Sequence, residues 1–488
     1  MEKTNKKFYI TTSIPYVNAP PHIGHALEFI QADVLARSQR AAGKDVFFLT
    51  GADEHGVKIA RAAEEAKKTT KKFVDENTDK IKKLIKILNI SNDDFIRTTD
   101  KKRHWPGAQK LWLNLAKAGD IYKKKYRGLY CAGHEAFVTD KDLVNGVCAL
   151  HKTKPEIIEE ENYFFRLSKY SKKIETFIKS GKLKVSPVSR RNEILSLLKE
   201  GLEDISFSRP AKSLSWGVPV PNDSEHTMYV WCDALSNYIT AIDYADSDNL
   251  KFKIKNLKFQ HWWPADVHVI GKDILRFHAA IWPGMLLSAK LPLPKTIFVH
   301  GFITSGGEKM SKTVGNVIDP LEVAAKYGVD ALRYYLLREI PSGEDGDFTF
   351  EKFEERYKAD LAKGIGNLAA RVLTLAQKGK VKAFKNMAFA SEIAKVKKDS
   401  AQSVLEFKFN EALEKIWRLI ALGDKYIDVQ KPWALESDSK KFKEIIGHLL
   451  FLISGIGELL IPFMPETAVQ IAKHISKSKS VVLFPRLK

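Results

Sequence analysis

The sequence predicts an α/β protein: a Rossmann-type parallel-sheet nucleotide domain, split by an insertion domain, followed by an all-α helical-bundle domain. Three observations predict this architecture. The chain opens with a strand–helix–strand pattern, its middle changes to short segments that carry cysteines and histidines, and strand patterns nearly vanish after residue 352.

The first elements are expected to form a βαβ unit. Residues 7–13 (KFYITTS) have the composition of a strand, and a proline-rich turn follows them. Apolar residues then recur from Ile23 to Val34 with the spacing of one helix face, and residues 45–50 (DVFFLT) form a second buried strand. Such a unit predicts a parallel sheet, and nucleotides bind at the carboxyl ends of its strands.

The rest of the chain divides by pattern. Strands at 227–231 and 267–270, each followed by a helical segment, indicate that the sheet resumes after an interruption. Apolar residues at helical spacing dominate the C-terminal part, which predicts a helical bundle. We therefore expect a first Rossmann half (1–121), a connective insertion (122–221), a second Rossmann half (222–299), a lysine loop with a junction (300–352) and the helical domain (353–488).

The charge balance favours a polyanionic partner. The 488 residues include 79 Lys and Arg against 59 Asp and Glu, which gives a formal net charge of +20. Such a surplus attracts nucleic acid or an anionic membrane surface. A solvated basic surface with no such partner explains the charge equally well.

Cysteine usage and hydropathy predict a cytoplasmic protein. Three cysteines, at 131, 148 and 232, are too few and too widely spaced for the disulfide framework of a secreted protein. The N-terminus shows neither a signal peptide nor an acid-free presequence. The most apolar stretch, 445–463, contains His448 and Glu458 and is expected to be a buried helix, so we expect no membrane segment.

Two histidines lie where the first strand passes into the first helix. Residues 21–25 (PHIGH) place His22 and His25 three residues apart on one face of a helical turn, and Gly24 leaves room beside them. A phosphate chain above this helix start would meet backbone N–H groups, the helix dipole and two ring donors. Histidines satisfied inside the fold, or a chance metal pair, are the alternatives.

A lysine loop lies past the middle of the chain. Residues 309–313 (KMSKT) follow Gly306 and Gly307, so Lys309 and Lys312 stand on a glycine-hinged loop. Such a loop could close over a leaving pyrophosphate and supply positive charge as the bond to the α-phosphate breaks. An exposed basic loop is the alternative. The histidine and lysine motifs together are far more specific than either alone.

An aromatic segment follows the strand predicted at 227–231. Residues 231–238 (WCDALSNY) offer an indole, a small residue and a phenol at helical spacing. Aromatic walls suit a flexible thioether through sulfur–aromatic contacts, with a phenol O–H as a weak partner for the sulfur. A stripe of core aromatics is the alternative reading.

These motifs together resemble those of the class I aminoacyl-tRNA synthetases. His22 to His25 match the HIGH motif of that class, and residues 309–313 match its KMSKS motif, with Thr313 in place of the usual serine. More specifically, TTSIPYVNAPPHIGHALEF, GADEHG, VWCDALSNYIT and HVIGKDILRFH resemble segments of the methionyl-tRNA synthetase family, in the same order. The resemblance covers nearly all 488 residues.

The resemblance implies roles for individual residues. Asp53 would hold the ammonium group of methionine, and the pocket would be lined by Ser13, Ile14, Tyr16, Trp231, Ala234, Leu235, Tyr238, Ile274 and His278. Some family members have proline at the position of Leu235. The ATP site, with Mg²⁺ accompanying the nucleotide, would consist of His22, Gly24, His25, Arg209, Gly271, Asp273, Lys309 and Lys312.

The insertion carries two ligand pairs with the short spacing of a zinc knuckle. Cys131-x-x-His134 and Cys148-x-x-His151 would form a Cys2His2 tetrahedron around a structural Zn²⁺, with no open position for catalysis. Family members that bind zinc here commonly have a cysteine in place of His134, and other members have lost the metal. Two unrelated cysteines are the alternative.

Three residues of the helical part match the family's anticodon readers. Asn367 and Arg371 lie four apart on one helix face, and Lys431-Pro432-Trp433 ends a separate helix. In the family, the matching residues read the CAU anticodon by hydrogen bonding to base edges and by stacking, which suits unstacked loop bases. Core packing or helix capping would explain each residue individually.

We therefore expect a methionine–tRNA ligase that forms methionyl-adenylate from L-methionine and ATP and loads initiator and elongator tRNA(Met). A class I enzyme for leucine, isoleucine or valine would need a larger insertion than 122–221, and a cysteine enzyme is a further alternative. A tRNA-binding protein without catalysis would have no use for the lysine loop. With no appended dimerisation domain after Lys488, a monomer is expected.

Overall fold

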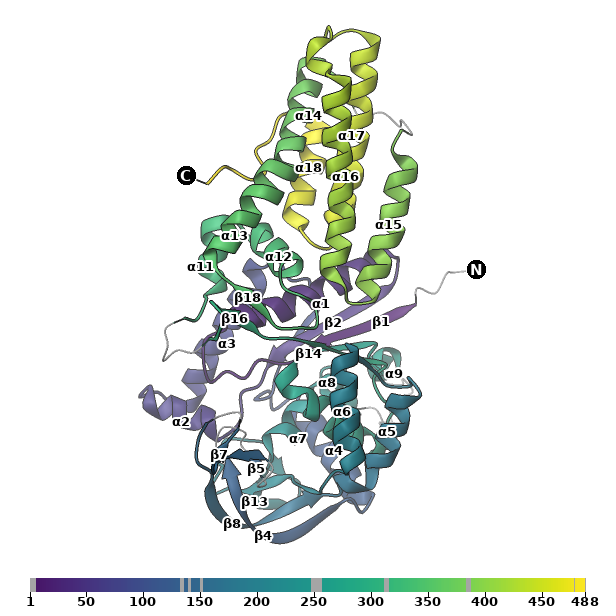
Figure 1. Cartoon of the computed structure of the whole chain (residues 1–488). Helices are drawn as coiled ribbons and strands as arrows, with labels where there is room; N and C mark the ends of the chain where they lie inside the picture. The colour runs from purple at the N-terminus through teal and green to yellow at the C-terminus, as the bar shows by residue number, and fades with distance from the viewer. Residues whose placement is uncertain are drawn as a thin grey trace. The chain divides into compact units, whose positions relative to one another are not determined.

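The chain forms two compact units in a computed structural model (Figure 1). Unit 1 comprises residues 1–21, 44–83 and 92–299, and unit 2 comprises 22–43, 84–91 and 300–488. The structure describes residues 6–131, 136–138, 142–149, 152–246, 257–310, 316–382, 388–477 and 479–487.

A six-stranded sheet forms the centre of unit 1. Its order is β3-β2-β1-β14-β15-β9, from strands β1 (Lys7–Thr12), β2 (Asp45–Ala52), β3 (Asp94–Arg97), β9 (Lys184–Ser186), β14 (Val267–Gly271) and β15 (Thr296–His300). Strand β1 pairs in parallel with β2 and β14, β2 with β3, and β15 with β9. The predicted Rossmann-type parallel sheet is confirmed, and its edge strand β9 comes from within the range 122–221.

Short antiparallel sheets and helices complete unit 1. Strands β10-β8-β4-β5 and β11-β13-β12 form two sheets, and β6 (Leu143–Val144) pairs with β7 (Val147–Cys148). The bounds are β4 (Ile121–Cys131), β5 (Ala136–Val138), β8 (Glu156–Phe165), β10 (Ile205–Ser206), β11 (Ser208–Pro210), β12 (Pro219–Val220) and β13 (Asp223–Met228). The helices are α2 (Val57–Glu65), most of α3 (Thr70–Ile87), α4 (Trp105–Lys117), α5 (Ser171–Lys179), α6 (Val188–Glu200), α7 (Val230–Leu235), α8 (Asn237–Thr240), α9 (Leu257–Trp262) and α10 (Trp282–Ser288).

The strand predicted at 227–231 is wrong after Met228, and its first two residues belong to a different sheet. Strand β13 ends at Met228 and pairs antiparallel with β11 and β12, outside the six-stranded sheet, and helix α7 begins at Val230. A short apolar run fits a buried helix as well as a buried strand, so its pattern alone could not separate the two. Sheet resumption is confirmed only at β14, where Val267 pairs with Ile10.

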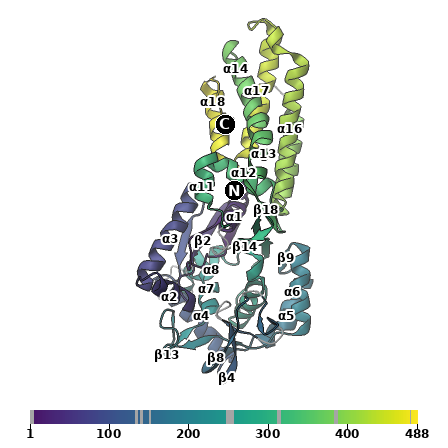
Figure 2. The same cartoon turned by 60° about the vertical axis from the view of Figure 1, so that its left-hand side comes forward.

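Unit 2 is mainly helical, as expected for the C-terminal part. Its helices are α1 (Ile23–Ala41), α11 (Pro320–Tyr327), α12 (Val329–Arg338), α13 (Phe350–Arg356), α14 (Gly366–Lys378), α15 (Ala390–Leu405), α16 (Phe409–Gln430), α17 (Lys440–Leu460) and α18 (Pro465–Lys477). Helices α14, α16 and α17 run side by side as a bundle in both views (Figures 1 and 2). A small sheet, β17-β16-β18, is built from β16 (Ile303–Ser305), β17 (Glu308–Lys309) and β18 (Gly346–Phe348).

Helix α17 is the buried helix expected around 445–463. Its apolar side chains, including Ile446, Leu449 and Ile453, are fully buried within the bundle. Among the helices of the described residues, none is long and apolar enough to cross a membrane.

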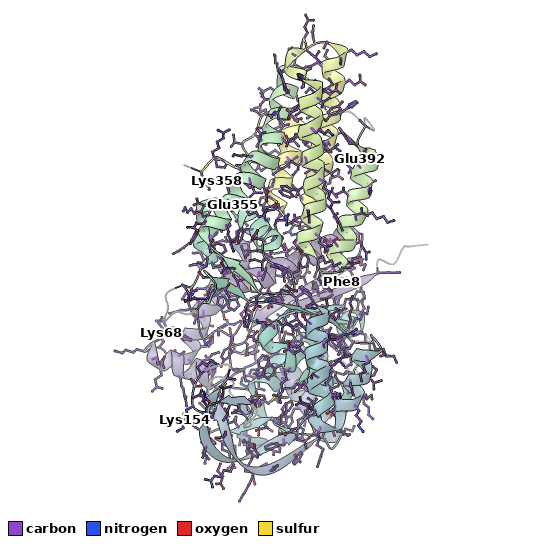
Figure 3. All side chains as sticks on the ribbon, in the orientation of Figure 1. Phe8, Lys68, Lys154, Glu355, Lys358 and Glu392 are labelled. Atoms are coloured by element: carbon purple, nitrogen blue, oxygen red, sulfur yellow. The ribbon has the colours of Figure 1, made fainter. Side chains whose placement is uncertain are left out.

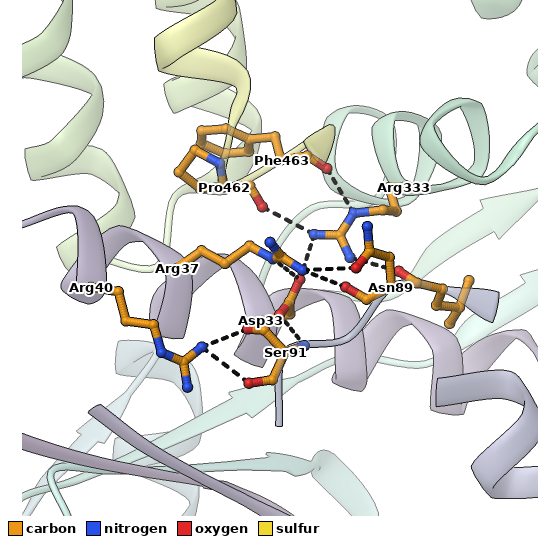
Figure 4. Close-up of polar contacts among 9 residues, drawn as sticks. Asp33, Arg37, Arg40, Asn89, Ser91, Arg333, Pro462 and Phe463 are labelled. Atoms are coloured by element: carbon orange, nitrogen blue, oxygen red, sulfur yellow. Dashed lines mark hydrogen bonds and ion pairs between the residues drawn. The ribbon is translucent and has the colours of Figure 1, made fainter. Parts of the chain in front are cut away.

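A buried ion pair fastens helix α1 inside unit 2 (Figure 4). Arg333, on α12, donates to Asp33 of α1 at 2.7 Å and to the carbonyl oxygens of Pro462 and Phe463, between α17 and α18, at 3.0 and 2.8 Å. Asp33 also accepts from the Ser91 backbone N–H at 2.8 Å. A buried charge pair is tolerated when further hydrogen bonds satisfy both groups, as they do here. Helix α1 is thereby fixed to the base of the bundle.

Charged side chains cover the surface. Lys68 and Lys154 extend away from the ribbon in Figure 3, whereas Phe8 is only 7% exposed. These two lysines are solvated, and the net charge alone locates no binding face.

Candidate active site

The two histidines of the PHIGH segment form a reciprocal cap at the start of α1. His22 is the N-cap residue, and its Nδ1 accepts the Gly24 N–H at 3.1 Å. His25, in the first turn, accepts the His22 backbone N–H through its own Nδ1 at 3.1 Å. The ring centroids are 4.1 Å apart, so the predicted pairing of the imidazoles on one face is confirmed.

This cap sets the protonation of both rings. Because each Nδ1 accepts a backbone N–H, each neutral ring carries its proton on Nε2. Burial lowers the pKa of His22 to about 4. Burial, reinforced by His22 and His300, also lowers the pKa of His25 well below its ordinary value. Both rings are therefore neutral at pH 7 and can act as hydrogen-bond donors.

Gly24 leaves room for the His22 ring in its capping position. A Cβ at this position would lie 2.9 Å from Cε1 of His22, closer than real Cβ contacts. The same cap corrects one expectation, that a phosphate would meet open backbone N–H groups here. The Gly24 N–H is bonded to His22, and the Ile23 N–H donates to the Ile318 carbonyl oxygen at 3.2 Å. Imidazole N–H groups, rather than these two amides, are left to meet an anion.

The lysine loop begins as a hairpin of β16 and β17. Gly306 and Gly307 form its turn with φ of +63° and +81°, where glycine is favoured, and Lys309 pairs with Thr304 across the hairpin. Lys312 and Thr313 lie outside the described residues.

Both flanks of this loop are hydrogen-bonded to α1. Before the hairpin, Nε2 of His300 lies 2.9 Å from Oε2 of Glu28, and both side chains are buried. After the loop, the Ile318 carbonyl accepts the Ile23 N–H. The helix that begins after His22 is thus joined, within unit 2, to the segments before and after the lysine loop.

In unit 1, the chain after β1 runs beside the end of β2. Tyr16 and Asp53 form a parallel bridge, in which the Asp53 N–H donates to the Pro15 carbonyl at 2.9 Å and the Val17 N–H to the Asp53 carbonyl at 3.1 Å. The Asp53 side chain is 7% exposed. Ser13, whose N–H donates to the Val269 carbonyl, lies on the same segment, as does Ile14. The structure therefore brings together Ser13, Ile14, Tyr16 and Asp53.

A second cluster in unit 1 is aromatic. Trp231 stacks on Phe277 with centroids 3.7 Å apart and planes 10° apart, and its ring meets that of His278 edge-on at 6.3 Å. Tyr238 Oη lies 2.7 Å from Nε2 of His278. Trp231, Ile274 and Phe277 are only partly buried against the core of unit 1. These side chains provide an apolar, partly open wall.

The His278 contacts correct the expected role of the Tyr238 hydroxyl. Nδ1 of His278 faces the Ile274 carbonyl at 3.0 Å and must donate to it, so Nε2 accepts and the phenol donates its proton to His278. Burial lowers the pKa of His278 to about 4, which keeps this ring neutral. The phenol proton is therefore engaged by His278 rather than offered to a sulfur atom.

The remaining predicted residues of unit 1 lie on several different elements. Ala234 and Leu235 are buried on α7, at 4% and 1% exposure. Gly271 ends β14, and the exposed Asp273 follows in a 3-10 turn (Lys272–Ile274). Arg209 pairs with Glu160 at 3.1 Å and lies over the Tyr130 ring, so an anionic ligand would have to compete for its guanidinium group.

Two features were missed by the sequence argument. Phe277, which stacks on Trp231, directly precedes His278, and its place in HVIGKDILRFH was the available signal. Asp233 receives 2.6 Å contacts from Nδ1 of His55 and Nε2 of His104. Burial by itself would raise the pKa of Asp233, but the two histidines outweigh it and hold the pKa below its ordinary value. The sequence signal was an aspartate within an apolar helix, because a buried charge needs polar partners. The sequence did not identify these partners as His55 and His104.

The cysteines of the predicted zinc knuckle lie together. Cys131 at the end of β4 and Cys148 in β7 are fully buried and pack with Val138 in one small cluster. Their expected partners His134 and His151 are outside the described residues. Two thiols brought together suit zinc, although within the described ranges no group of three or more metal-binding side chains occurs.

The anticodon candidates lie on the bundle of unit 2. Arg371 of α14 lies 5.6 Å from the centroid of Trp433, and its guanidinium contacts Asp428 at 2.7 Å. Trp433 is 50% exposed in the 3-10 turn (Pro432–Ala434) that follows α16. Asn367 is exposed one helical turn before Arg371. An exposed indole beside a guanidinium is a suitable stacking platform for a base.

Comparison with known proteins places these features in a family. A family model described as tRNA synthetases class I (M) matches residues 8–143 and 138–373, and one described as the anticodon-binding domain of tRNA ligase matches 386–487. The methionine–tRNA ligase of Brucella suis biovar 1 is 42% identical over 481 residues, 96% of this chain and 91% of the relative. That of Clostridium perfringens strain 13 is 44% identical over 489 residues, 96% and 73% of the two chains.

Solved structures support the same family. The Mycobacterium tuberculosis methionyl-tRNA synthetase in complex with methionyl-adenylate has a TM-score of 0.89 at 40% identity, covering 96% of this chain and 93% of that one. The apo form of that synthetase has a TM-score of 0.84 at 34% identity, covering 100% and 99%. The chain therefore belongs to the methionyl-tRNA synthetase family of class I aminoacyl-tRNA synthetases.

Proposed function

We propose that this chain is a methionine–tRNA ligase that activates L-methionine with Mg-ATP and transfers the methionyl group to the 3′-terminal adenosine of initiator and elongator tRNA(Met). The family assignment supports the reaction. The observation that carries it for this chain is the hydrogen bond from Ile23 to Ile318, which joins the helix of His22 and His25 to the flank of the lysine loop.

The first step forms the adenylate. A carboxylate oxygen of methionine attacks the α-phosphorus of ATP, the bond to the bridging oxygen breaks, and pyrophosphate leaves with the electron pair. The neutral His22 and His25 rings donate from Nε2 to phosphate oxygens, and Lys309 and Lys312 offset the charge that develops on pyrophosphate. Neutral donors stabilise this charge and need no proton transfer.

The other nucleotide contacts are proposed by family correspondence. Gly24 allows the close approach of the triphosphate, Gly271 and Asp273 meet the ribose, and Arg209 meets the carboxylate and phosphates after exchanging its contact with Glu160. The exposed position of Asp273 after β14 suits a ribose hydroxyl.

Methionine recognition divides between a charged and an apolar part. Asp53, buried beside Tyr16, pairs with the ammonium group. The thioether lies against the cluster of Trp231, Tyr238 and His278, which has its polar atoms largely satisfied internally and so favours a soft, weakly polar sulfur. The wider pocket is Ser13, Ile14, Tyr16, Ala234, Leu235 and Ile274.

In the second step, a hydroxyl of the terminal adenosine attacks the adenylate carbonyl carbon and the bond from that carbon to the phosphate oxygen breaks. AMP leaves with the electron pair, and the hydroxyl proton passes to the leaving phosphate, so no covalent enzyme intermediate is required. Asn367, Arg371 and Trp433 would select the CAU anticodon. The basic surface then has a polyanionic partner, and its phosphate contacts make binding depend on salt.

The remaining proposals concern stability and context. Zn²⁺, held by Cys131, His134, Cys148 and His151, would stabilise the β4–β7 region without taking part in catalysis, and metal analysis with chelator-dependent melting tests it. We also propose a cytoplasmic monomer, checked by fractionation and sedimentation.

The domain organisation stays a prediction, with five ranges that begin at residues 1, 122, 222, 300 and 353. Limited proteolysis can test these boundaries.

ATP–pyrophosphate exchange with each of the amino acids tests the function. Exchange should depend on methionine, and tRNA(Met) should be charged while a transcript with an altered anticodon is charged far more slowly. Exchange supported best by isoleucine, leucine, valine or cysteine would contradict the methionine assignment. Binding of tRNA without any exchange would support the non-catalytic alternative.

A further inference from the structure

Asp347 holds the turn of the hairpin that leads into the lysine loop. Its Oδ1 accepts the Gly307 backbone N–H at 2.8 Å and the Thr304 hydroxyl at 2.8 Å. Strand β18 brings it there, because Thr304 and Asp347 are paired in the parallel register of β16 and β18. One carboxylate oxygen therefore bonds both the first strand of the hairpin and its turn.

The hairpin needs such support because it is very short. Strand β17 has only two residues, Glu308 and Lys309, and an isolated two-stranded hairpin is marginal in water. Gly306 and Gly307 both have positive φ and leave the turn unusually free in the absence of outside contacts. Asp347 supplies this outside contact at Gly307, which lies two residues before Lys309.

The carboxylate is charged where it acts. The hydrogen bond from the Gly307 N–H, with a smaller effect of the Thr304 hydroxyl, lowers the pKa of Asp347 below its ordinary value. Hydrogen bonds to a charged acceptor are stronger than neutral ones. Lys352 Nζ lies 3.6 Å from the other oxygen, Oδ2, and the side chains of this pair are 50% and 25% exposed, so the turn rather than this pair is the specific contact.

We propose that Asp347 is a positioning residue for methionine activation, which fixes the Gly306–Gly307 turn so that Lys309 enters the lysine loop in one backbone position. The inference rests on the proposed role of Lys309. Asp347 itself touches no substrate. Its removal leaves the fold of the helical bundle in place and lets the start of the loop move, which lowers the rate of the chemical step rather than the affinity for methionine.

The test measures ATP–pyrophosphate exchange for three variants of the full chain. Asp347→Ala removes the acceptor and should lower kcat roughly tenfold, the usual effect of losing one charge-assisted hydrogen bond, with the KM for methionine unchanged. Asp347→Asn keeps an acceptor oxygen and should recover most of the rate. Lys352→Met, the matched control, removes the exposed ion pair and should behave as wild type.

A double-mutant cycle separates positioning of Lys309 from any other role. If Asp347 acts through Lys309, then Asp347→Ala has little further effect on exchange in a Lys309→Ala background. Multiplicative losses would overturn the proposal, and so would a wild-type rate for Asp347→Ala. Thermal unfolding of each variant shows whether the rate loss follows from lost stability, in which case Asp347→Ala would lower the active fraction and not kcat per active site.

Failure of the underlying function gives a different result. If Lys309→Ala alone exchanges pyrophosphate at the wild-type rate, the role of the lysine is refuted, and the positioning proposal falls with it. If Lys309→Ala is slow while Asp347→Ala is normal, the proposed function stands and only the positioning proposal is overturned.

Discussion

Nε2 of His300 lies 2.9 Å from a carboxylate oxygen of Glu28, so the strand that leads to the lysine hairpin is bonded to the helix whose start is capped by the two histidines. Nδ1 of the same ring lies 2.8 Å from the Gly301 carbonyl oxygen. The ring is thus held on both sides, and the hairpin begins at a fixed point relative to α1.

Replacing His300 by alanine should free the start of the hairpin from helix α1. We expect the kcat for pyrophosphate exchange to fall about tenfold, the effect of losing one hydrogen bond to a charged group, while the KM for methionine stays within about twofold. Steady-state exchange at saturating ATP measures this. A rise in the methionine KM with a normal kcat would place the function of His300 elsewhere.

Gly24→Ala tests the packing of the histidine cap. The new methyl group would lie 2.9 Å from the His22 ring, which must then rotate and give up its bond to the backbone of residue 24. We expect a loss of exchange activity of at least roughly tenfold with a fall in stability of about 1 kcal/mol, the value of an N-cap. Ala41→Gly, at an exposed position of the same helix, is a control for changed helix propensity.

The buried neutral histidines predict a stability that decreases in acid. The pKa of His22 is about 4 in the folded chain against about 6.5 when unfolded, so the unfolded chain binds more protons between these values. The contribution of His22 is complete above pH 6.5 and is lost as the pH falls toward 4. At pH 5 the loss is about 2 kcal/mol.

His22→Asn isolates this effect, because asparagine is also a good N-cap but does not titrate. Urea unfolding midpoints at pH 7.5 and 5.0 should differ less for the variant than for the wild type. Equal pH dependence in the two proteins would show that His22 does not carry the depressed pKa.

Trp433→Ala should affect tRNA and not activation. The exposed indole beside Arg371 is proposed to stack on an anticodon base, and such stacking is worth about 1–3 kcal/mol. We expect kcat/KM for tRNA(Met) to fall between roughly fivefold and a hundredfold, with methionine-dependent exchange unchanged. An equal loss in both assays would assign Trp433 a structural role.

Local patterns allowed the sequence to predict much of this molecule. The βαβ start, the pairing of the two histidine rings, the glycine pair before Lys309 and the buried helix α17 all depend on residues close together in the chain. The parallel sheet followed from these elements, because strands separated by helices pair in parallel.

Long-range partners could not be predicted in this way. Arg333 and Asp33 are 300 residues apart, and no periodicity marks a buried ion pair. The same holds for Asp347 with Gly307 and for Asp233 with its two histidines. The strand predicted at 227–231 is wrong after Met228 for a different reason, because so short a segment carries too little periodicity to separate a strand from a helix.

The most direct test of the central claim is a double-mutant cycle between His25 and Lys309 in single-turnover adenylate formation. If both act on one triphosphate in the transition state, His25→Gln and Lys309→Ala should each slow the step strongly, and their combined loss should be smaller than the product of the single losses. Wild-type adenylate formation by either single variant would contradict the account.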